Sequence, residues 1–142
     1  MKLNQQVSSS LNTPQPEPGA GEGAEVWPTI TENTNLALPE WLAVDMRERN
    51  RIGTAKYGTP LRVWNGRHPV IDAYQEALDL IVYVQQARAR LGNYSLLDRG
   101  TSSAHNVLAL TFHQALQAAR HLGELARLGT VPLTPPPARG GR

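Results

Sequence analysis

The helical pattern that runs from Pro69 to Leu91 constrains the fold of this chain of 142 residues more than any other feature. Proline at the first helical position and glycine just after the last one, here Gly92, are typical helix boundaries. Apolar residues surround most of this helix, so it needs packing partners on more than one side. These apolar residues of the helix are Val70, Ile71, Ala73, Leu78, Ile81, Val82 and Val84. The sequence therefore predicts a helix that is buried among other helices.

An earlier helix is expected from about residue 38 to 56. Pro39 suits its first helical position, and Glu40 is favourable to the helix dipole. The sequence Gly58-Thr59-Pro60 ends it, because glycine and proline both interrupt a helix.

A third helix is expected from about residue 103 to 128, with Ser102 or Ser103 as its N-cap and Gly129 at its end. No stretch keeps the two-residue period of a β-strand for long. The predicted fold class is therefore all-α, an antiparallel helical bundle.

Both ends of the chain are rich in proline and glycine and poor in large apolar residues. This composition predicts disordered tails over residues 1–35 and 131–142, with a helical domain over 36–130. Such a domain has about 95 residues, which is enough for a small core, especially if subunits share apolar surface.

Composition excludes several functional classes. The chain has no cysteine, which excludes disulfides and thiolate metal sites. A formal net charge of +2 with no basic run gives no support for binding to polymeric nucleic acid. We find no apolar stretch of membrane-spanning length and no apolar core of a signal peptide, so no membrane association is expected and a cytoplasmic location is the default.

Acidic residues share one face of the helix over 69–91. At about 100° of rotation per residue, Glu76 lies about 40° from Asp72, and Asp79 about 20° on the other side. Tyr83 falls in the same arc. Carboxylates crowded in apolar surroundings have raised pKa values unless a cation neutralises them. Hard divalent cations prefer oxygen ligands, so the pattern favours a Mg²⁺ or Mn²⁺ site.

The helix over 38–56 carries a second acidic pair, Asp45 and Glu48, which are neighbours on its surface at a spacing of three residues. Lys56 lies about 20° from Asp45 around the same helix. Facing helices commonly build metal sites from such side chains. The alternative is an exposed ion pair between Asp45 and Arg49, and Asp72 could likewise serve only the helix dipole.

The spacing of these acidic pairs resembles a known family. Asp45-x-x-Glu48 is followed after 27 residues by Glu76-x-x-Asp79. Together with Lys56-Tyr57-Gly58-Thr59 and Asn65-Gly66-Arg67, this pattern resembles the MazG-like branch of the all-α nucleoside triphosphate pyrophosphohydrolases, and small phage-encoded members in particular. The resemblance covers about residues 40 to 92. The first motif departs from the family pattern, because the usual double glutamate is missing and Asp45 stands where glutamate is more common.

The resemblance implies a metal-dependent enzyme that cleaves a nucleoside triphosphate between its α- and β-phosphates, giving a monophosphate and pyrophosphate. Glu48, Glu76 and Asp79 would be catalytic and would hold Mg²⁺ or Mn²⁺, with Asp45 as a ligand or as a residue that orients one. Glu48 could also accept the proton of the attacking water. A purine (d)NTP such as dGTP or dATP is the expected substrate, and the location would be the host cytoplasm if the chain is phage-encoded.

Further residues could bind the substrate. Lys56 and Arg67 could neutralise phosphate, Arg67 through two parallel hydrogen bonds. Asn65 could bond a base or sugar edge, and Tyr83 could donate to phosphate. Trp64 could stack on a base, although a hydrophobic clamp over the core is the alternative for this residue.

Two other functions stay open at this point. One is a non-enzymatic helical oligomerisation or adaptor module, and the other is a phosphohydrolase that removes a different phosphate unit. A three-helix bundle this short leaves apolar residues uncovered, notably Leu110, Leu116 and Leu122, so we expect a homodimer or homotetramer, as the family also implies.

Overall fold

The computed structural model describes residues 11–92, 99–129, 131–132 and 134–137, and this part of the chain is mostly helical. It forms two compact units, which are treated separately below. One unit contains helices α4 (Pro69–Leu91) and α5 (Arg99–Leu128), with residues 11–14 before them. The other contains the remaining elements, which are β1 (Glu22–Glu25), α2 (Val26–Thr31), the short 3-10 helix η1 (Thr34–Leu36), α3 (Glu40–Tyr57) and β2 (Arg62–Trp64).

Helix α4 has the boundaries that the sequence predicts. It begins with Pro69, whose missing N–H has no role in the first turn. It ends at Leu91, and the N–H of Gly92 donates to the carbonyl of Arg88 at 2.9 Å. Arg88 and Arg90 in the last turn are favourable to the helix dipole.

Helix α5 starts four residues earlier than expected, at Arg99. The prediction that Ser102 or Ser103 caps this helix is wrong, because both residues lie inside it. The prediction for its end is confirmed: Leu128 is its last residue, and Gly129 follows with a positive φ of 62°. Glycine adopts this left-handed conformation without a Cβ penalty.

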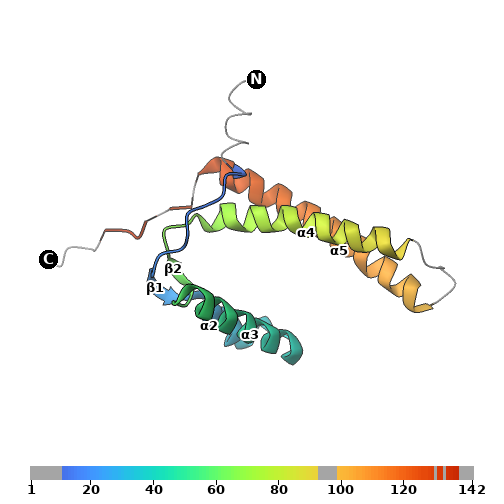
Figure 1. Ribbon diagram of the computed structural model, residues 1–142, viewed down its shortest axis with the longest axis horizontal. Helices are drawn as coiled ribbons and strands as arrows, with labels where there is room; N and C mark the ends of the chain where they lie inside the picture. The colour runs from blue at the N-terminus through green and yellow to red at the C-terminus, as the bar shows by residue number, and fades with distance from the viewer. Residues whose placement is uncertain (1–10, 93–98, 130, 133, 138–142) are drawn as a thin grey trace, which may run out of the picture. The chain divides into compact units, whose positions relative to one another are not determined.

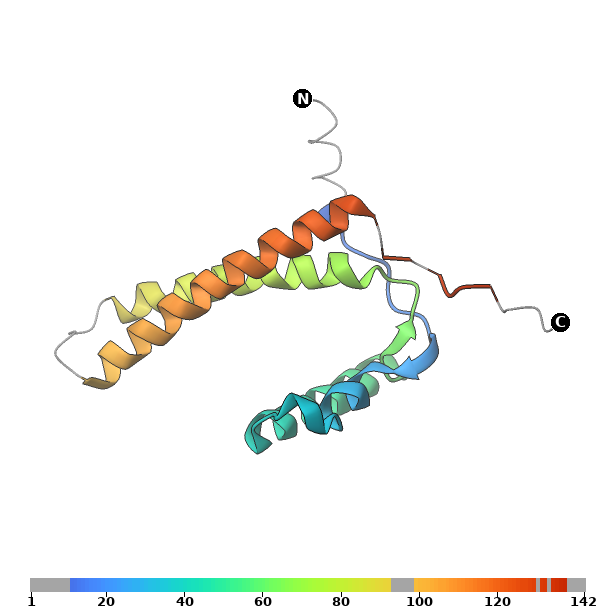
Figure 2. The same ribbon diagram turned by 180° about the vertical axis from the view of Figure 1, so that it is seen from behind.

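Helices α4 and α5 pack side by side and run in opposite directions (Figures 1 and 2). On α4 the buried residues recur every seven positions, at Val70, Ala77 and Val84. On α5 the buried residues recur every four positions, at Ala115, Ala119 and Gly123. Small side chains on both helices allow their backbones to approach closely.

Leu11 adds to the core of this unit and is 4% exposed. The side-chain amide of Gln75 on α4 donates to the carbonyls of Leu11 at 2.8 Å and Thr13 at 3.0 Å. Residues 11–13 are therefore held against the first half of α4.

In the second unit, β1 and β2 form a two-stranded antiparallel sheet. Glu22 pairs with Trp64 and Glu25 with Arg62, so β1 has one extra residue between these pairs. Gly23 lies in this bulge with a φ of 83°, where any other residue would be strained.

Helix α2 follows β1 directly and packs against α3. Pro28 is compatible with α2 because it lies in the first turn, where backbone N–H groups have no helical partner. Helix α3 begins two residues later than predicted and ends at Tyr57, with Gly58 in the left-handed conformation as its C-cap. Ala43 is its one buried residue.

The structure departs from the sequence predictions at the N-terminal side. Residues 1–35 were expected to be a disordered tail, and no strands were expected. Residues 1–10 lie outside the described part, but β1 and α2 lie within the rest of this segment and β2 pairs with β1. Strands of four and three residues are too short to show a clear period. Of the expected tail over 131–142, residues 133 and 138–142 lie outside the described part.

Large apolar side chains remain exposed on every long helix. On α5 they include Val107, Leu110, Leu116, Leu125 and Leu128. On α4 they include Leu80, Val82 and Tyr83, so the prediction of a helix buried nearly all round is wrong for the chain by itself. Within the ranges described, no helix is both long enough and apolar enough to span a bilayer.

Candidate functional site

The acidic arc of α4, which we define as Asp72, Glu76 and Asp79, lies outside the line of residues that this helix buries. Val70, Ala77 and Val84 mark the buried line of α4, and Glu76 and Asp79 lie about 100° and about 160° from that line. Glu76 and Asp79 are accordingly exposed, and Asp72 is half-buried. The desolvation expected from the sequence is therefore absent at Glu76 and Asp79 in the chain by itself.

Glu76 and Asp79 have no basic neighbour on their own helix at the spacings of three or four residues that bring side chains together. None of the ion pairs found among the described residues includes either of them. Tyr83, 65% exposed, follows Asp79 by four residues on the same face. Two carboxylates at this spacing repel each other, and a cation that binds both would remove that repulsion.

The second acidic pair, Asp45 and Glu48, is exposed on α3. Arg51 binds Glu48 through two hydrogen bonds, from Nε at 2.8 Å and from Nη2 at 2.7 Å. The hydrogen bond from this guanidinium, with its charge, holds the pKa of the Glu48 carboxyl below its ordinary value. The ion pair between Asp45 and Arg49 that was the alternative prediction is not among those found in the described part of the chain.

Lys56 lies in the last turn of α3 and is exposed. Its ammonium group lies over the Tyr57 ring, 4.8 Å from the ring centroid. Such a contact at an exposed site is weak, about 0.5–1 kcal/mol, so it leaves Lys56 able to bind an anion.

The expected substrate residues Trp64, Asn65 and Arg67 lie in and just after β2 and are half-buried. Trp64 packs against β1, because a Cβ placed on Gly23 would come within 3.2 Å of its ring atom Cδ1. The side chain of Asn65 accepts a hydrogen bond from the N–H of Arg67 at 3.1 Å, which forms a tight turn. Arg67 donates from Nη1 to the carbonyl of Pro16 at 2.6 Å.

The candidate residues are divided between the two units. Six of them lie in the unit that contains α3 and β2, namely Asp45, Glu48, Lys56, Trp64, Asn65 and Arg67. Glu76, Asp79 and Tyr83 lie in the unit that contains α4. No group of three or more His, Asp or Glu side chains that could hold a metal ion is found among the residues that the structure describes.

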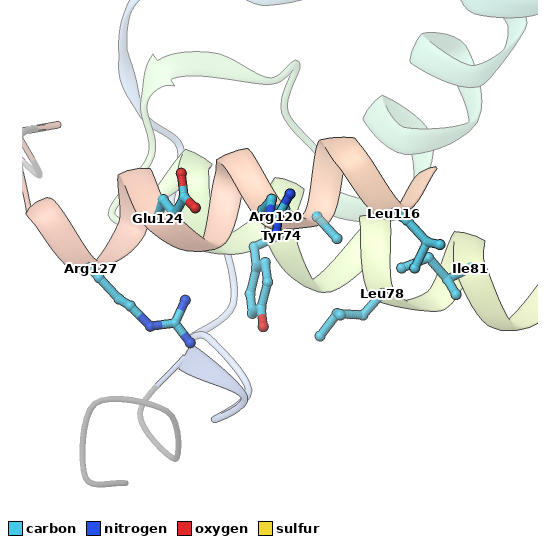
Figure 3. A pocket seen from close by; sticks show the side chains of 8 residues that line it. Tyr74, Leu78, Ile81, Leu116, Arg120, Glu124 and Arg127 are labelled. Carbon is cyan, nitrogen blue, oxygen red and sulfur yellow. The ribbon is translucent and has the colours of Figure 1, made fainter. Parts of the chain in front are cut away.

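An open pocket of about 340 Å³ on the face formed by α4 and α5 was not foreseen from the sequence (Figure 3). Its wall is apolar, and charged side chains from α5 lie at its edge. The lining residues are Tyr74, Leu78, Ile81, Leu116, Ala119, Arg120, Glu124 and Arg127. Arg120, Glu124 and Arg127 are spaced by four and three residues, which places them on one face of α5. This spacing was the sequence signal that could have indicated the edge of the pocket.

We compared the chain with models of known protein families, with curated proteins and with solved structures, and none of the three comparisons finds a match. The resemblance carried by the motifs between Asp45 and Asp79 therefore stays a prediction. What it implies about function enters below as a proposal.

Proposed function

We propose that the chain is a metal-dependent nucleotide pyrophosphohydrolase, in which Glu76 and Asp79 bind Mg²⁺ or Mn²⁺. Its reaction adds water to a (d)NTP, taken to be a purine such as dGTP or dATP, and releases the (d)NMP and pyrophosphate. Asp45 and Glu48 are the further acidic residues of this proposal.

One observation carries the proposal. Glu76 and Asp79 are exposed neighbours on α4, and no Lys or Arg lies at a helical spacing that could neutralise them. Like charges at this spacing destabilise a helix by about 0.2–0.5 kcal/mol, whereas a divalent cation with oxygen ligands makes the same spacing favourable. The donor set of carboxylates suits Mg²⁺ or Mn²⁺ rather than a softer metal.

Glu48 can give up its present partner, Arg51, and bind a metal ion or a water molecule instead. Its ion pair with Arg51 is exposed on both sides. Exposed ion pairs contribute little to stability, so a stronger electrostatic partner can replace this one. Arg51 lowers the pKa of the Glu48 carboxyl, so Glu48 is ionised at neutral pH and is competent as a ligand. Exchange of Arg51 for another partner would remove the hydrogen bond that lowers this pKa, which would make the carboxylate a stronger acceptor of the water proton.

In the proposed reaction, a bound Mg²⁺ or Mn²⁺ would lower the pKa of water and neutralise phosphate oxygens. Water attacks phosphorus, its proton passes to Glu48, and the bond to the departing pyrophosphate breaks. Lys56 and Arg67 would bind the remaining phosphate charge, and Tyr83 would donate a hydrogen bond to it. Asn65 and Trp64 would contact the nucleoside, although the packing of Trp64 on Gly23 also fits the structural alternative.

The test is to incubate the purified chain with each common (d)NTP and Mg²⁺ or Mn²⁺ and to separate the products by anion exchange. Monophosphate plus pyrophosphate is expected, and Glu76→Gln should abolish both. Glu124→Gln is the matched control, because it removes an exposed carboxylate from α5 and should leave turnover intact. Turnover that survives in Glu76→Gln, or no turnover of any triphosphate, would refute the proposal. Release of a single phosphate would indicate a different phosphohydrolase.

A second candidate function is a non-enzymatic oligomerisation or adaptor module, and the exposed apolar side chains of α5 favour it. Leu110 and Leu128 are 59% and 70% exposed, which is unusual for leucines on a long helix of an isolated domain. An adaptor would show no metal-dependent stabilisation beyond the effect of added salt. The same surface also fits the expected homodimer or homotetramer of the enzyme, so metal dependence distinguishes the two functions.

A further inference from the structure

Residues 16–26, which we call the N-terminal strap, lie along residues 59–67 within one compact unit. Figures 1 and 2 both show the chain entering β1 beside the chain that forms β2. Pairing of β1 with β2 explains only the centre of this contact. Hydrogen bonds on both sides of the sheet extend it.

Backbone hydrogen bonds join the strap to residues 59–67 at two points outside the sheet. The N–H of Gly19 donates to the carbonyl of Asn65 at 3.0 Å, and the N–H of Val26 donates to the carbonyl of Leu61 at 2.9 Å. The hydroxyl of Thr59 adds a bond to the carbonyl of Ala20 at 3.1 Å.

Two arginines of residues 59–67 also donate to the strap. Arg67 binds the carbonyl of Pro16 at 2.6 Å, and Arg62 binds the carbonyl of Gly23 at 2.8 Å. Arg62 further pairs with Glu25, which belongs to the strap, at 3.5 Å. The strap therefore supplies neutral carbonyls and one carboxylate to guanidinium groups that could bind an anion.

Glycines of the strap make this close approach possible. Gly21 has a φ of 76°, and a Cβ at this position would come within 2.8 Å of the Trp64 carbonyl oxygen and 3.1 Å of Arg62 Cβ. Gly19 differs, since its φ is not positive and its nearest contact would be Asn65 O at an ordinary 3.8 Å. A side chain at residue 21 should therefore displace the strap, whereas one at residue 19 should not.

We infer that the strap competes with polyphosphate for Arg67, so that residues 59–67 become an anion-binding site when residues 16–26 leave it. A guanidinium binds a charged phosphate more strongly than a neutral carbonyl such as that of Pro16, because both partners of the hydrogen bond are then ionised. The inference deepens the proposed function and depends on it for the identity of the anion as the phosphates of a nucleotide.

The experiment uses the full chain, without metal and with EDTA present, and inorganic tripolyphosphate as the probe. Hydrogen exchange of the Gly19 and Val26 amides reports whether the strap is in place, and calorimetry at constant ionic strength reports binding. Gly21→Ala should speed exchange at both amides and tighten tripolyphosphate binding. The expected gain is about tenfold, the change that follows when the competent fraction rises from about a tenth to nearly all. Gly19→Ala is the matched control and should change neither quantity.

Two further variants keep the test decisive. Arg67→Gln in the Gly21→Ala background should return the affinity to that of the unaltered chain. Thr59→Val removes one bond to the strap without adding a clash, and it should give a smaller gain in the same direction even if Gly21→Ala fails to fold.

The inference would be overturned by faster exchange without tighter binding, or by a gain in tripolyphosphate affinity that survives Arg67→Gln. Unchanged exchange in both Gly21→Ala and Thr59→Val would overturn it as well. Because tripolyphosphate binding needs no turnover, its outcome is separate from that of the proposed function. If the variants gain tripolyphosphate affinity through Arg67 but the chain hydrolyses no triphosphate, the inference about the strap would stand and the proposed enzymatic function would be refuted.

Discussion

The ring of Tyr74 on α4 lies directly over the backbone of Gly123 on α5. A Cβ added at residue 123 would come within 2.9 Å of the ring atom Cε2 and within 3.4 Å of Cδ2. Arg127 is equally close, since its Nη1 would lie 2.9 Å from the same Cβ, and this nitrogen donates to the Gly123 carbonyl at 2.7 Å. The two helices can therefore pack in this way only because residue 123 is glycine and has no Cβ.

Gly123→Ala should therefore destabilise the α4–α5 pair. Overpacking costs about 1–3 kcal/mol, and the higher helix propensity of alanine returns about 1 kcal/mol, so we expect a net loss of about 1 kcal/mol in the free energy of unfolding. Chemical unfolding followed by helical circular dichroism measures it. Gly53→Ala is the matched control, because nothing lies within 4 Å of a Cβ there. It should stabilise α3 by about 0.5–1 kcal/mol, and an equal gain from Gly123→Ala would contradict the contact with Tyr74.

Arg51→Gln should raise the pKa of the Glu48 carboxyl toward its ordinary value. Hydrogen bonds from Arg51 hold that pKa low, and the substitution removes both the charge and the paired geometry. Carboxyl carbon NMR over an acid titration measures the shift directly. Arg49→Gln should leave the titration of Glu48 nearly unchanged, since the bonds to this carboxyl come from Arg51.

The same ion pair gives the chain a pH dependence of stability with a defined sign. A carboxyl with a lowered pKa in the folded state stabilises above its unfolded pKa, and this contribution fades as the pH falls through the folded value. On acidification, the melting temperature of the unaltered chain should thus fall by a small amount that reflects this ion pair, and Arg51→Gln should lack that part of the fall. A larger loss in Arg51→Gln than in the unaltered chain would contradict this sign.

Mn²⁺ should raise the melting temperature through Glu76 and Asp79. A ligand present at a hundred times its Kd stabilises the folded state by about 2.7 kcal/mol. Scanning calorimetry with MnCl₂, against NaCl at equal ionic strength, tests this expectation. Glu76→Gln and Asp79→Asn should each remove most of the shift, and Glu124→Gln should keep it. A shift of equal size in all four proteins would place the metal elsewhere or show only a salt effect.

Leu110→Lys should weaken self-association of the chain. Leu110 is exposed on α5, and an unpaired charge within an apolar contact is costly to desolvate. Light scattering should find a dimer or tetramer for the unaltered chain and a smaller species for Leu110→Lys. Ala55→Lys, at an exposed position of α3, is the control for an added charge. A monomer at micromolar concentration before any substitution would refute the expected oligomer.

Much of the helical structure follows from local rules that the sequence displays. Both boundaries of α4 were predicted because Pro69 and Gly92 act within a single turn and need no tertiary partner. The start of α5 was missed because Ser102 and Ser103 are good caps in isolation, yet the helix continues on their N-terminal side. Propensity at a helix end is a small energy that neighbouring turns override.

The sheet and its strap could not be predicted, because they depend on contacts between distant segments. Nothing near Gly21 or Gly23 indicates that residues 62–64 lie opposite, and glycine-rich composition is equally typical of a flexible linker. The packing of Trp64 on Gly23 is visible only once both strands are in place.

For the candidate site, helical spacing placed Glu76, Asp79 and Tyr83 on one arc of α4. All three are exposed there, whereas the sequence led us to expect apolar surroundings. The rule of three- and four-residue spacing also points to Arg51 as the partner of Glu48, since no other base lies at these spacings, but the sequence analysis considered only the pair of Asp45 with Arg49. The metal site, the substrate residues and the activity stay predictions that the experiments above address.

The strap also sets the order in which its unit can be completed. Ala20 and Thr59 are 39 residues apart, and Pro16 and Arg67 are 51 residues apart. At about 5–20 residues per second, a growing chain exposes residues 16–26 for about 2–10 s before residue 67 is made. Helices α2 and α3, which pack against each other, are both made within that interval, whereas the strap must wait for residues 59–67. Residues 16–26 are therefore synthesised early but reach their place only after residue 67 has been made.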